Sequence, residues 1–248
     1  MAEKIRTNCI LIRKQPYGES SLVIQAFSES LGMFSAIAKG FCRPPQNKAV
    51  LLNVMNEYEF ILSASCSNGM HTLTEFSAIT EFPTDLPVEN WALMQAGIEL
   101  ISKILIPAHE TPQFYDLLLK YLKYQRGIEK NPVAIFWRFL LHLYKLLGID
   151  IGLPNCSLCH GLMKQPAGFE TGTGRPLCAD CLPKVGSAFS FSPEAAEVMS
   201  VLPMIGNYIN DLEIDAESIR QINHFFLYYL NSQFHNNIDL KSLHYYKR

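Results

Sequence analysis

The sequence predicts an α+β multidomain fold: a small N-terminal β-barrel, then an all-α domain with an inserted four-cysteine module. Residues 1–83 contain short runs rich in β-branched and aromatic residues, separated by turn residues. After Pro83 the apolar residues recur at helical spacing. Two Cys-x-x-Cys pairs then interrupt this helical pattern. We therefore expect a barrel domain at 1–83, a helical domain at 84–248 and the cysteine module at about 154–184.

Five runs predict the strands of the barrel, at residues 5–14, 20–28, 33–40, 57–64 and 70–82. Their partial alternation of apolar and polar residues is typical of strands with one buried face. Turn residues separate the runs, and Asn68-Gly69 between the last two is a common hairpin turn. Five short strands in so few residues favour a small closed or half-open barrel.

Helices are predicted at residues 87–106, 112–125, 131–147, 192–202 and about 215–234. Thr111, Asn131 and Ser192 each precede a proline, which predicts that each is a helix N-cap. Gly148 is the expected stop of the third helix. The aromatic stretch HFFLYYLNSQF at 224–234 favours a core helix over a partner-binding surface.

Charge and hydropathy limit the class and location of the protein. No apolar run reaches the roughly 18 to 20 residues that span a bilayer, and the first apolar run ends at Arg13 and Lys14. We therefore expect a cytoplasmic protein with reduced thiols and no membrane partner. Residues 1–50 contain seven basic and three acidic residues, a segment compatible with a polyanionic partner. The pI of about 6.4 argues against a strong general nucleic-acid binder.

Four cysteines, Cys156, Cys159, Cys178 and Cys181, have the spacing of a zinc site. Two Cys-x-x-Cys turns can place four thiolates around one ion, each about 2.3 Å from it. Because sulfur fills every position, such a site is structural, and the ion stabilises a loop too small to bury its own core. The other three cysteines are expected to be ordinary thiols: Cys9, Cys42 and Cys66.

Other roles for the four thiols are less consistent with the sequence. An iron–sulfur cluster stays open, because four thiolates also hold one. A thioredoxin-like pair would follow a strand in an α/β pattern, and a nucleobase deaminase would contain His-x-Glu and Pro-Cys-x-x-Cys. None of these patterns is found. His160 lies beside Cys159 and is an alternative ligand to one thiolate.

A second stretch, AIAKGFCRPPQN at 36–47, carries Lys39, Gly40 and Arg43 at the end of a predicted strand. Basic side chains on a rigid barrel loop can contact phosphates, and the alternative is a solvated loop. With YGES at 17–20, the Ala-Lys-Gly-x-x-Arg signature at 38–43 resembles the first domain of the bacterial RecO family of recombination mediators. The helix WRFLLHLYKLLG, which leads into NCSLC and later GRPLCADC, resembles the second domain, so the resemblance covers nearly the whole chain.

This resemblance implies an OB-fold barrel, a helical domain with one structural Zn²⁺, and a role without catalysis in DNA repair and homologous recombination. It implies binding to single- and double-stranded DNA, annealing of complementary strands, and a place at the nucleoid. With RecR, such proteins help load RecA onto strands covered by single-strand-binding protein (SSB). The DNA contacts would fall on Lys39 and Arg43, with Arg13, Lys14 and Lys48 as neighbours. The acidic, Phe-ending tail of SSB would bind the helical domain at Arg138, for which the alternative is an ordinary surface arginine.

The loop after Lys39 departs from the family pattern. Phe41, Cys42 and Gln46 stand where more charge is usual, which predicts weaker DNA binding with a shallower salt dependence. Base stacking on aromatic side chains would compensate. The candidates are Tyr17, Phe27, Phe34 and Phe41, of which Phe27 and Phe34 are expected in the core.

Two other classes of function stay open. The first is a protein-interaction scaffold with little direct DNA binding, which the weakly basic loop would suit. The second is an enzyme with a structural zinc module. The sequence supports the enzyme poorly, because it contains no phosphate loop, His-Glu-x-x-His, Gly-x-Ser-x-Gly or dinucleotide-binding motif.

Overall fold

The computed structural model describes residues 4–45, 47–64, 69–83, 85–149, 151–234 and 238–246. Two residues of interest in the sequence, Cys66 and Asn68, lie outside these ranges. The chain forms two compact units, Met1–Arg126 and Gly127–Arg248. Two helices after residue 83 therefore group with the barrel by their contacts. The domain boundary near residue 83 marks the change from strands to helices and stays a prediction.

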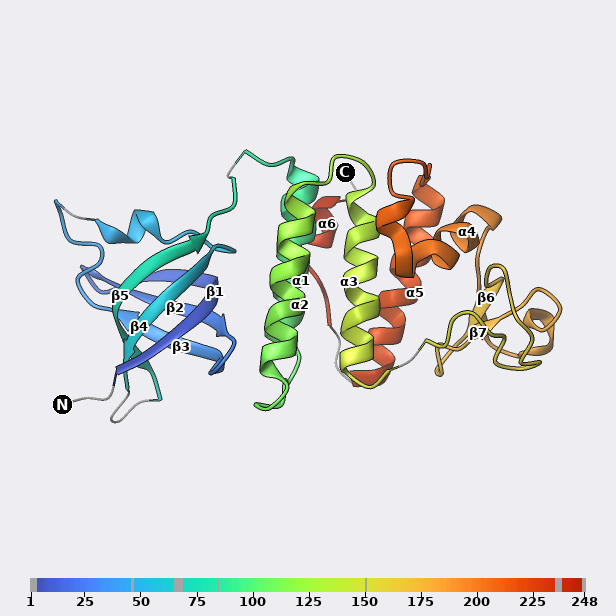
Figure 1. The fold of residues 1–248 in the computed structure, drawn as a ribbon, viewed down its shortest axis with the longest axis horizontal. Coiled ribbons are helices and arrows are strands. Elements are labelled where there is room, and N and C mark those ends of the chain that lie inside the picture. Colours follow the sequence, from blue (N-terminus) through green and yellow to red (C-terminus); the bar gives the residue numbers. More distant parts are fainter. Residues whose placement is uncertain are drawn as a thin grey trace. The chain divides into compact units, whose positions relative to one another are not determined.

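Five strands form a closed barrel in the first unit (Figure 1). They are β1 (Lys4–Tyr17), β2 (Ser21–Ser28), β3 (Gly32–Ala38), β4 (Glu57–Ser63) and β5 (His71–Thr80). The order around the barrel is β1-β2-β3-β5-β4, and β4 pairs with β1 to complete the ring. The closure between β3 and β5 is parallel, with Ala36 opposite His71 and Ile37 opposite Thr72. A five-stranded barrel of this kind confirms the OB-fold prediction.

Alternation along the strands explains the barrel core. Successive side chains of a strand point to opposite faces, so every second residue lines the interior. The interior is apolar and buried, and it includes Cys9, Leu11, Leu22, Ile24, Ala26, Phe34, Ala36, Ala38, Tyr58, Phe60, Leu62 and Leu73. Phe27 is also fully buried, but its ring lies 6.2 Å from that of Tyr115 on a helix. One outer face of the barrel is therefore covered by helix within the same unit.

Two helices complete the first unit, α1 (Val88–Lys103) and α2 (Thr111–Arg126). They pack closely at Gly97, where a Cβ atom would lie 3.0 Å from Cδ1 of Tyr121. The Tyr121 hydroxyl donates to the Leu93 carbonyl, which fixes the ring in this position. A small residue at 97 thus allows the two helices to approach.

A buried carboxylate joins the barrel to α2. Glu57 of β4 accepts hydrogen bonds from the hydroxyls of Thr80 (2.7 Å) and Tyr115 (3.1 Å), and Lys123 lies 3.6 Å away. Burial, and then the Glu57 charge, raise the pKa of the Tyr115 phenol, so it stays a hydrogen-bond donor. A buried charge with several partners is tolerated because each oxygen is satisfied.

The second unit contains four helices among its described residues: α3 (Pro132–Leu146), α4 (Pro193–Val201), α5 (Ala216–Phe234) and the short α6 (Leu243–Tyr246). Two buried hydrogen bonds join α3 to α5, from Trp137 Nε1 to Asn223 Oδ1 (2.7 Å) and from the Tyr144 hydroxyl to the Phe226 carbonyl (2.6 Å). The aromatic stretch of α5 is a core helix as predicted, since Phe225, Phe226, Tyr229 and Leu230 are buried.

The helix ends test the predicted caps. Ser192 caps α4 by accepting from the Ala195 amide (3.2 Å), and Gly148 follows α3 with φ of +75°. Asn131 occupies the N-cap position of α3 with Pro132 after it, as predicted, but its side chain makes no capping hydrogen bond. Its backbone is left-handed (φ 54°), and its side chain donates to the carbonyls of Ile209 and Leu212. The cap prediction for Thr111 is wrong, because α2 begins at Thr111 itself; its hydroxyl donates to the carbonyl of Pro107.

Candidate metal centre and nucleic-acid interface

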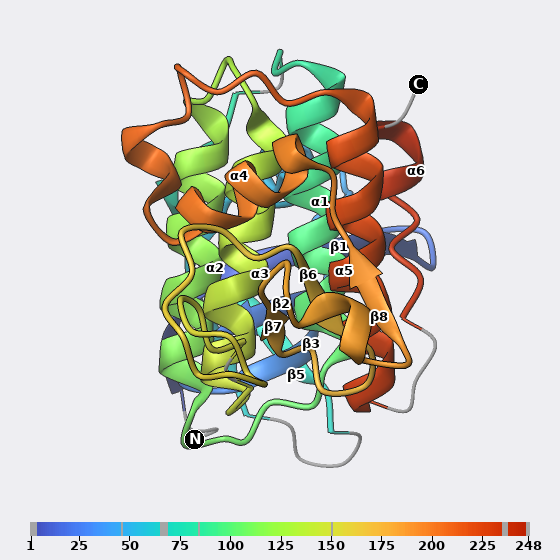
Figure 2. The ribbon, with the colours of Figure 1, turned by 90° about the vertical axis from the view of Figure 1, so that its right-hand side faces the viewer.

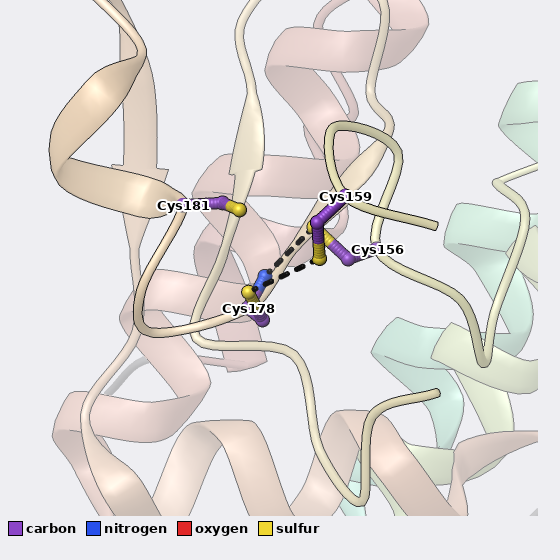
Figure 3. Close-up of side chains that lie close together, drawn as sticks. All are labelled: Cys156, Cys159, Cys178 and Cys181. Carbon is purple, nitrogen blue, oxygen red and sulfur yellow. Dashed lines mark hydrogen bonds between the residues drawn. The ribbon is translucent and has the colours of Figure 1, made fainter. Parts of the chain in front are cut away.

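Two chain reversals present the four cysteines to one point. In the first, the Cys156 amide donates to Gly161 O and the His160 amide to Cys156 O, both at 2.9 Å. In the second, the Cys181 amide donates to Cys178 O at 3.1 Å. The four sulfur atoms all lie within 4.8 Å of one another (Figure 3). The sequence spacing thus translates into a single cluster.

The geometry of the cluster suits a tetrahedral ion. With sulfur about 2.3 Å from the ion, the edge of such a tetrahedron is about 3.8 Å long. The sulfurs of Cys159 and Cys178 are 3.9 Å apart, and the Cys178 amide donates to the Cys156 sulfur at 3.4 Å. Four close cysteines can therefore hold a metal ion with no position left for substrate. His160 is exposed and is not part of the cluster.

The acidities of the thiols show why the cluster suits a cation. Burial opposes ionisation of Cys156, but amide donors from Cys159, Cys178 and Leu158 outweigh it and lower the pKa of its thiol to about 6. For Cys181 the hydrogen bond with the Cys178 thiol, burial and the neighbouring thiols raise the pKa to about 12. Four thiolates cannot share this space without a compensating positive charge, which a divalent ion would supply.

The cysteine module is held on α5. Its short strands β6 (Gly168–Glu170), β7 (Pro176–Leu177) and β8 (Ala188–Ser190) form a sheet in the order β7-β6-β8, which Figure 2 shows beside α5. The Phe169 ring packs against that of Phe225 with their centres 4.3 Å apart, and the Tyr229 hydroxyl donates to Thr173 O at 2.7 Å. Gly174 (φ +63°) lies against the Tyr229 ring, where a Cβ atom would overlap it. The module therefore packs on the helical core at an aromatic surface.

The basic loop of the barrel follows β3. Lys39 and Arg43 are exposed on either side of the Gly40 turn, where the Arg43 amide donates to Gly40 O at 3.1 Å. The Cys42 amide donates to Ser20 O at 2.9 Å, so this loop lies beside the turn between β1 and β2. The structure thus presents Lys39 and Arg43 to solvent at the same end of the barrel as that turn.

The three neighbouring cations are placed differently. Arg13 is exposed, and it pairs with Gln25 just beyond a bulge in β1. Lys14 follows on the opposite face of β1, and its ammonium donates to Ala49 O at 3.0 Å. The ammonium of Lys48 lies 5.5 Å from the centre of the Phe41 ring. Lys14 and Lys48 therefore make contacts within the loop region, and Arg13 lies apart from them.

The aromatic candidates for base stacking divide sharply. Phe27 and Phe34 are buried, as expected, and Phe41 is buried too, with 5% of its surface exposed. Its ring packs against Phe76 in the barrel core. The suggestion that Phe41 stacks on bases is therefore wrong for this structure. Tyr17, the last residue of β1, is 61% exposed, so its ring is accessible to a base.

Both parts of the chain match models of a known protein family. Residues 1–82 match the family model described as "Recombination protein O N terminal", and residues 88–244 match "Recombination protein O C terminal". The chain belongs to the RecO family. Membership supports a role in DNA repair and recombination, and it supports DNA binding.

Curated relatives carry the name "DNA repair protein RecO". One from Syntrophomonas wolfei is 26% identical over 201 residues, which cover 80% of this chain and 78% of the relative. Another from Oceanobacillus iheyensis is 24% identical over 215 residues, covering 86% of this chain and 78% of the relative. A Bacillus cereus relative is 25% identical and covers 68% of this chain and 67% of its own length. The resemblance recognised in the sequence is confirmed.

In this RecO chain, Arg138 lies half-buried on α3, and its guanidinium packs near Gly206 in the 3-10 helix Leu202–Asn207. His142 and Lys145 follow it on the same side of α3, one and two turns along. Partial desolvation, and then the charges of Arg138 and Lys145, lower the pKa of His142. His142 and Lys145 were not predicted from the sequence, although their spacing from Arg138 would have indicated them.

Within the described part of the RecO chain, no helix combines the length and apolarity that a bilayer span requires.

Proposed function

We propose that this RecO-family protein is a recombination mediator that binds single- and double-stranded DNA and anneals complementary strands. With RecR, it would help load RecA onto single strands covered by SSB. Family membership over both domains is the observation that carries the proposal. An OB-type barrel with exposed cations beside one of its turns supports it. This function would place the protein at the nucleoid, in the cytoplasm.

Strand annealing needs no catalytic acid or base. It needs the repulsion between phosphates to be screened while the bases stay available for pairing. Lys39 and Arg43 are exposed on the barrel loop and suit the first task. We assign Arg13, Lys14 and Lys48 as their neighbours at the interface, and Tyr17 as the exposed ring for stacking. The proposal includes no catalytic step.

The test is fluorescence anisotropy of the protein with labelled single-stranded DNA over a series of salt concentrations. The variant Lys39→Glu/Arg43→Glu is expected to bind more weakly and with a shallower salt dependence, by about 0.7 for each lost phosphate contact. The double variant Lys164→Glu/Lys184→Glu is a matched control, because it changes the charge equally at exposed sites in the other unit. Equal losses in both variants would place the DNA contact elsewhere.

We further propose that the acidic, Phe-ending tail of SSB binds at Arg138. The cationic side chains of Arg138 and Lys145 on α3 suit an acidic peptide. Anisotropy with a labelled peptide of that chemistry tests this, with Arg138→Ala expected to weaken binding. Lys184→Ala, on the cysteine module, is the control. Unchanged affinity in Arg138→Ala would make Arg138 an ordinary surface residue.

The four cysteines, Cys156, Cys159, Cys178 and Cys181, are proposed to hold one structural Zn²⁺. A site filled by four sulfurs has no place for water or substrate, so the ion stabilises the module and takes no part in binding DNA. Metal analysis of the purified protein distinguishes zinc from an iron–sulfur cluster. One zinc per chain is expected, and iron with sulfide would overturn the assignment.

A protein scaffold that reaches DNA only through its partners is the second candidate. The buried position of Phe41 and the contacts of Lys14 and Lys48 within the loop favour it, since they leave few side chains for DNA. The absence of DNA binding in the anisotropy experiment, even at low salt, would select this alternative.

A further inference from the structure

Lys14 faces the interior side of β1 near the end of the barrel. In the barrel register it lies opposite Ile24 of β2, which in turn lies opposite Ala36 of β3. Ile24 and Ala36 are fully buried in the barrel core. Because paired residues of neighbouring strands share a face, Lys14 extends from the core face and not from the outer face that Arg13 occupies. Its side chain is half-buried as a result.

The ammonium of Lys14 meets the loop after β3. It donates to the carbonyl of Ala49 at 3.0 Å, within the 3-10 helix Lys48–Leu51. That helix has no side-chain hydrogen bond at its N-terminal cap. Two side chains of the barrel donate to carbonyls of this helix, Lys14 to Ala49 and the Tyr58 hydroxyl to Leu51 at 3.0 Å, and only the Lys14 donor is charged.

The same loop is fastened at Phe41. The Phe41 ring is buried in the barrel core, and its carbonyl accepts from the Ala49 amide at 3.1 Å. The Ala49 carbonyl thus accepts a hydrogen bond from Lys14, and the Ala49 amide donates one to the Phe41 carbonyl. Lys39 lies between the end of β3 and Phe41, and Arg43 lies between Phe41 and Ala49; both side chains are exposed. The chain that carries both cations is therefore held at Phe41, at Cys42 through Ser20, and at Ala49 through Lys14.

We infer that Lys14 is a positioning residue, which orders the basic loop from within the barrel, and not a phosphate ligand. Its ammonium clamps the 3-10 helix onto β1 and so holds Lys39 and Arg43 in place before DNA arrives. This inference rests on the proposed DNA binding, and it changes the role assigned to Lys14 within that site.

Hydrogen exchange of the free protein separates a positioning residue from a phosphate ligand. In Lys14→Met, peptides that cover residues 41–52 are expected to exchange about fivefold faster, the change for loss of one net hydrogen bond. Lys39→Met, which removes an exposed cation from the same loop, should leave that exchange unchanged. Lys14→Arg keeps a charged donor and should restore protection. Exchange in β2 and β4 reports that the barrel remains folded in each variant.

DNA binding over a salt series supplies the second readout. Lys39→Met should lower the salt slope by about 0.7, whereas Lys14→Met should weaken binding and keep the slope. Unchanged loop exchange in Lys14→Met, or a slope lowered by about 0.7 with the loop still protected, would overturn the inference. If no variant and no wild-type protein binds DNA, the proposed function fails, and the exchange result alone decides whether Lys14 clamps the loop.

Discussion

Gly174 offers the sharpest test of how the cysteine module is held on α5. The substitution Gly174→Ala adds one methyl group at a residue with φ of +63°. The new Cβ atom would lie 2.8 Å from Cδ2 of Tyr229 and closer still to Cε2 and Cζ. The ring cannot move aside easily. It is buried, its hydroxyl donates to Thr173 O, and Tyr144 and Phe225 pack on it.

Two terms give the expected cost. A left-handed backbone costs a residue with a side chain about 1–2 kcal/mol, from which about 0.4–1 kcal/mol is recovered through the less flexible unfolded chain. Overpacking against a fixed ring adds about 1–3 kcal/mol. We therefore expect Gly174→Ala to destabilise the second unit by about 2–4 kcal/mol. This is a large part of the stability of a typical domain.

Gly172→Ala is the matched control. Gly172 has φ of +88°, and a Cβ atom there would meet no atom within 4 Å. Its substitution should cost about 1 kcal/mol, from the backbone alone. Urea unfolding of the wild type and both variants, followed by circular dichroism, measures the difference. In a Tyr229→Leu background the excess cost of Gly174→Ala should shrink. Equal costs for the two glycine variants would refute the argument that the Tyr229 contact holds the module.

Three other predictions follow from single contacts. Cys178→Ser should lose the bound metal and lower the melting temperature, whereas Cys42→Ser, at a free thiol in the barrel, should keep the metal; metal analysis with thermal melting measures both. Tyr115→Phe should destabilise the protein by about 1–3 kcal/mol in urea unfolding, because it removes a donor from the buried Glu57 carboxylate. Asp215 caps α5 and its pKa is lowered by this contact, so its contribution to stability is present above about pH 4 and is lost as the pH falls.

Controls distinguish these effects from general damage. Tyr124→Phe removes a hydroxyl from an exposed ring on α2 and should change stability little. An equal loss of unfolding free energy in Tyr115→Phe and Tyr124→Phe would show that the hydrogen bond from Tyr115 to Glu57 does not stabilise the protein. For Asp215, the variant Asp215→Asn keeps a capping oxygen and cannot titrate. A wild-type melting temperature that runs parallel to that of Asp215→Asn from pH 7 to pH 3 would contradict the prediction.

Local patterns in the sequence determined most of the secondary structure and the metal cluster. The strands fall where β-branched and aromatic residues alternate between turn residues, and the helices fall where apolar residues recur at helical spacing. Ser192 caps the start of α4 and Gly148 follows the end of α3, as predicted, because capping depends on a few neighbouring atoms. The four cysteines converge because a Cys-x-x-Cys turn fixes the direction of both thiols.

The tertiary structure alone decided what each side chain contacts. Asn131 has the sequence context of a cap, yet its amide binds the carbonyls of a loop about 80 residues away. Phe41 looked available for stacking, yet it is a core residue, and Lys14 reaches a carbonyl 35 residues along the chain. Glu57 is a buried contact between the barrel and α2 because Tyr115 and Lys123 of that helix pack against it. These outcomes depend on contacts between segments that are distant in sequence. The spacing of residues within one segment does not determine which distant segment packs against it.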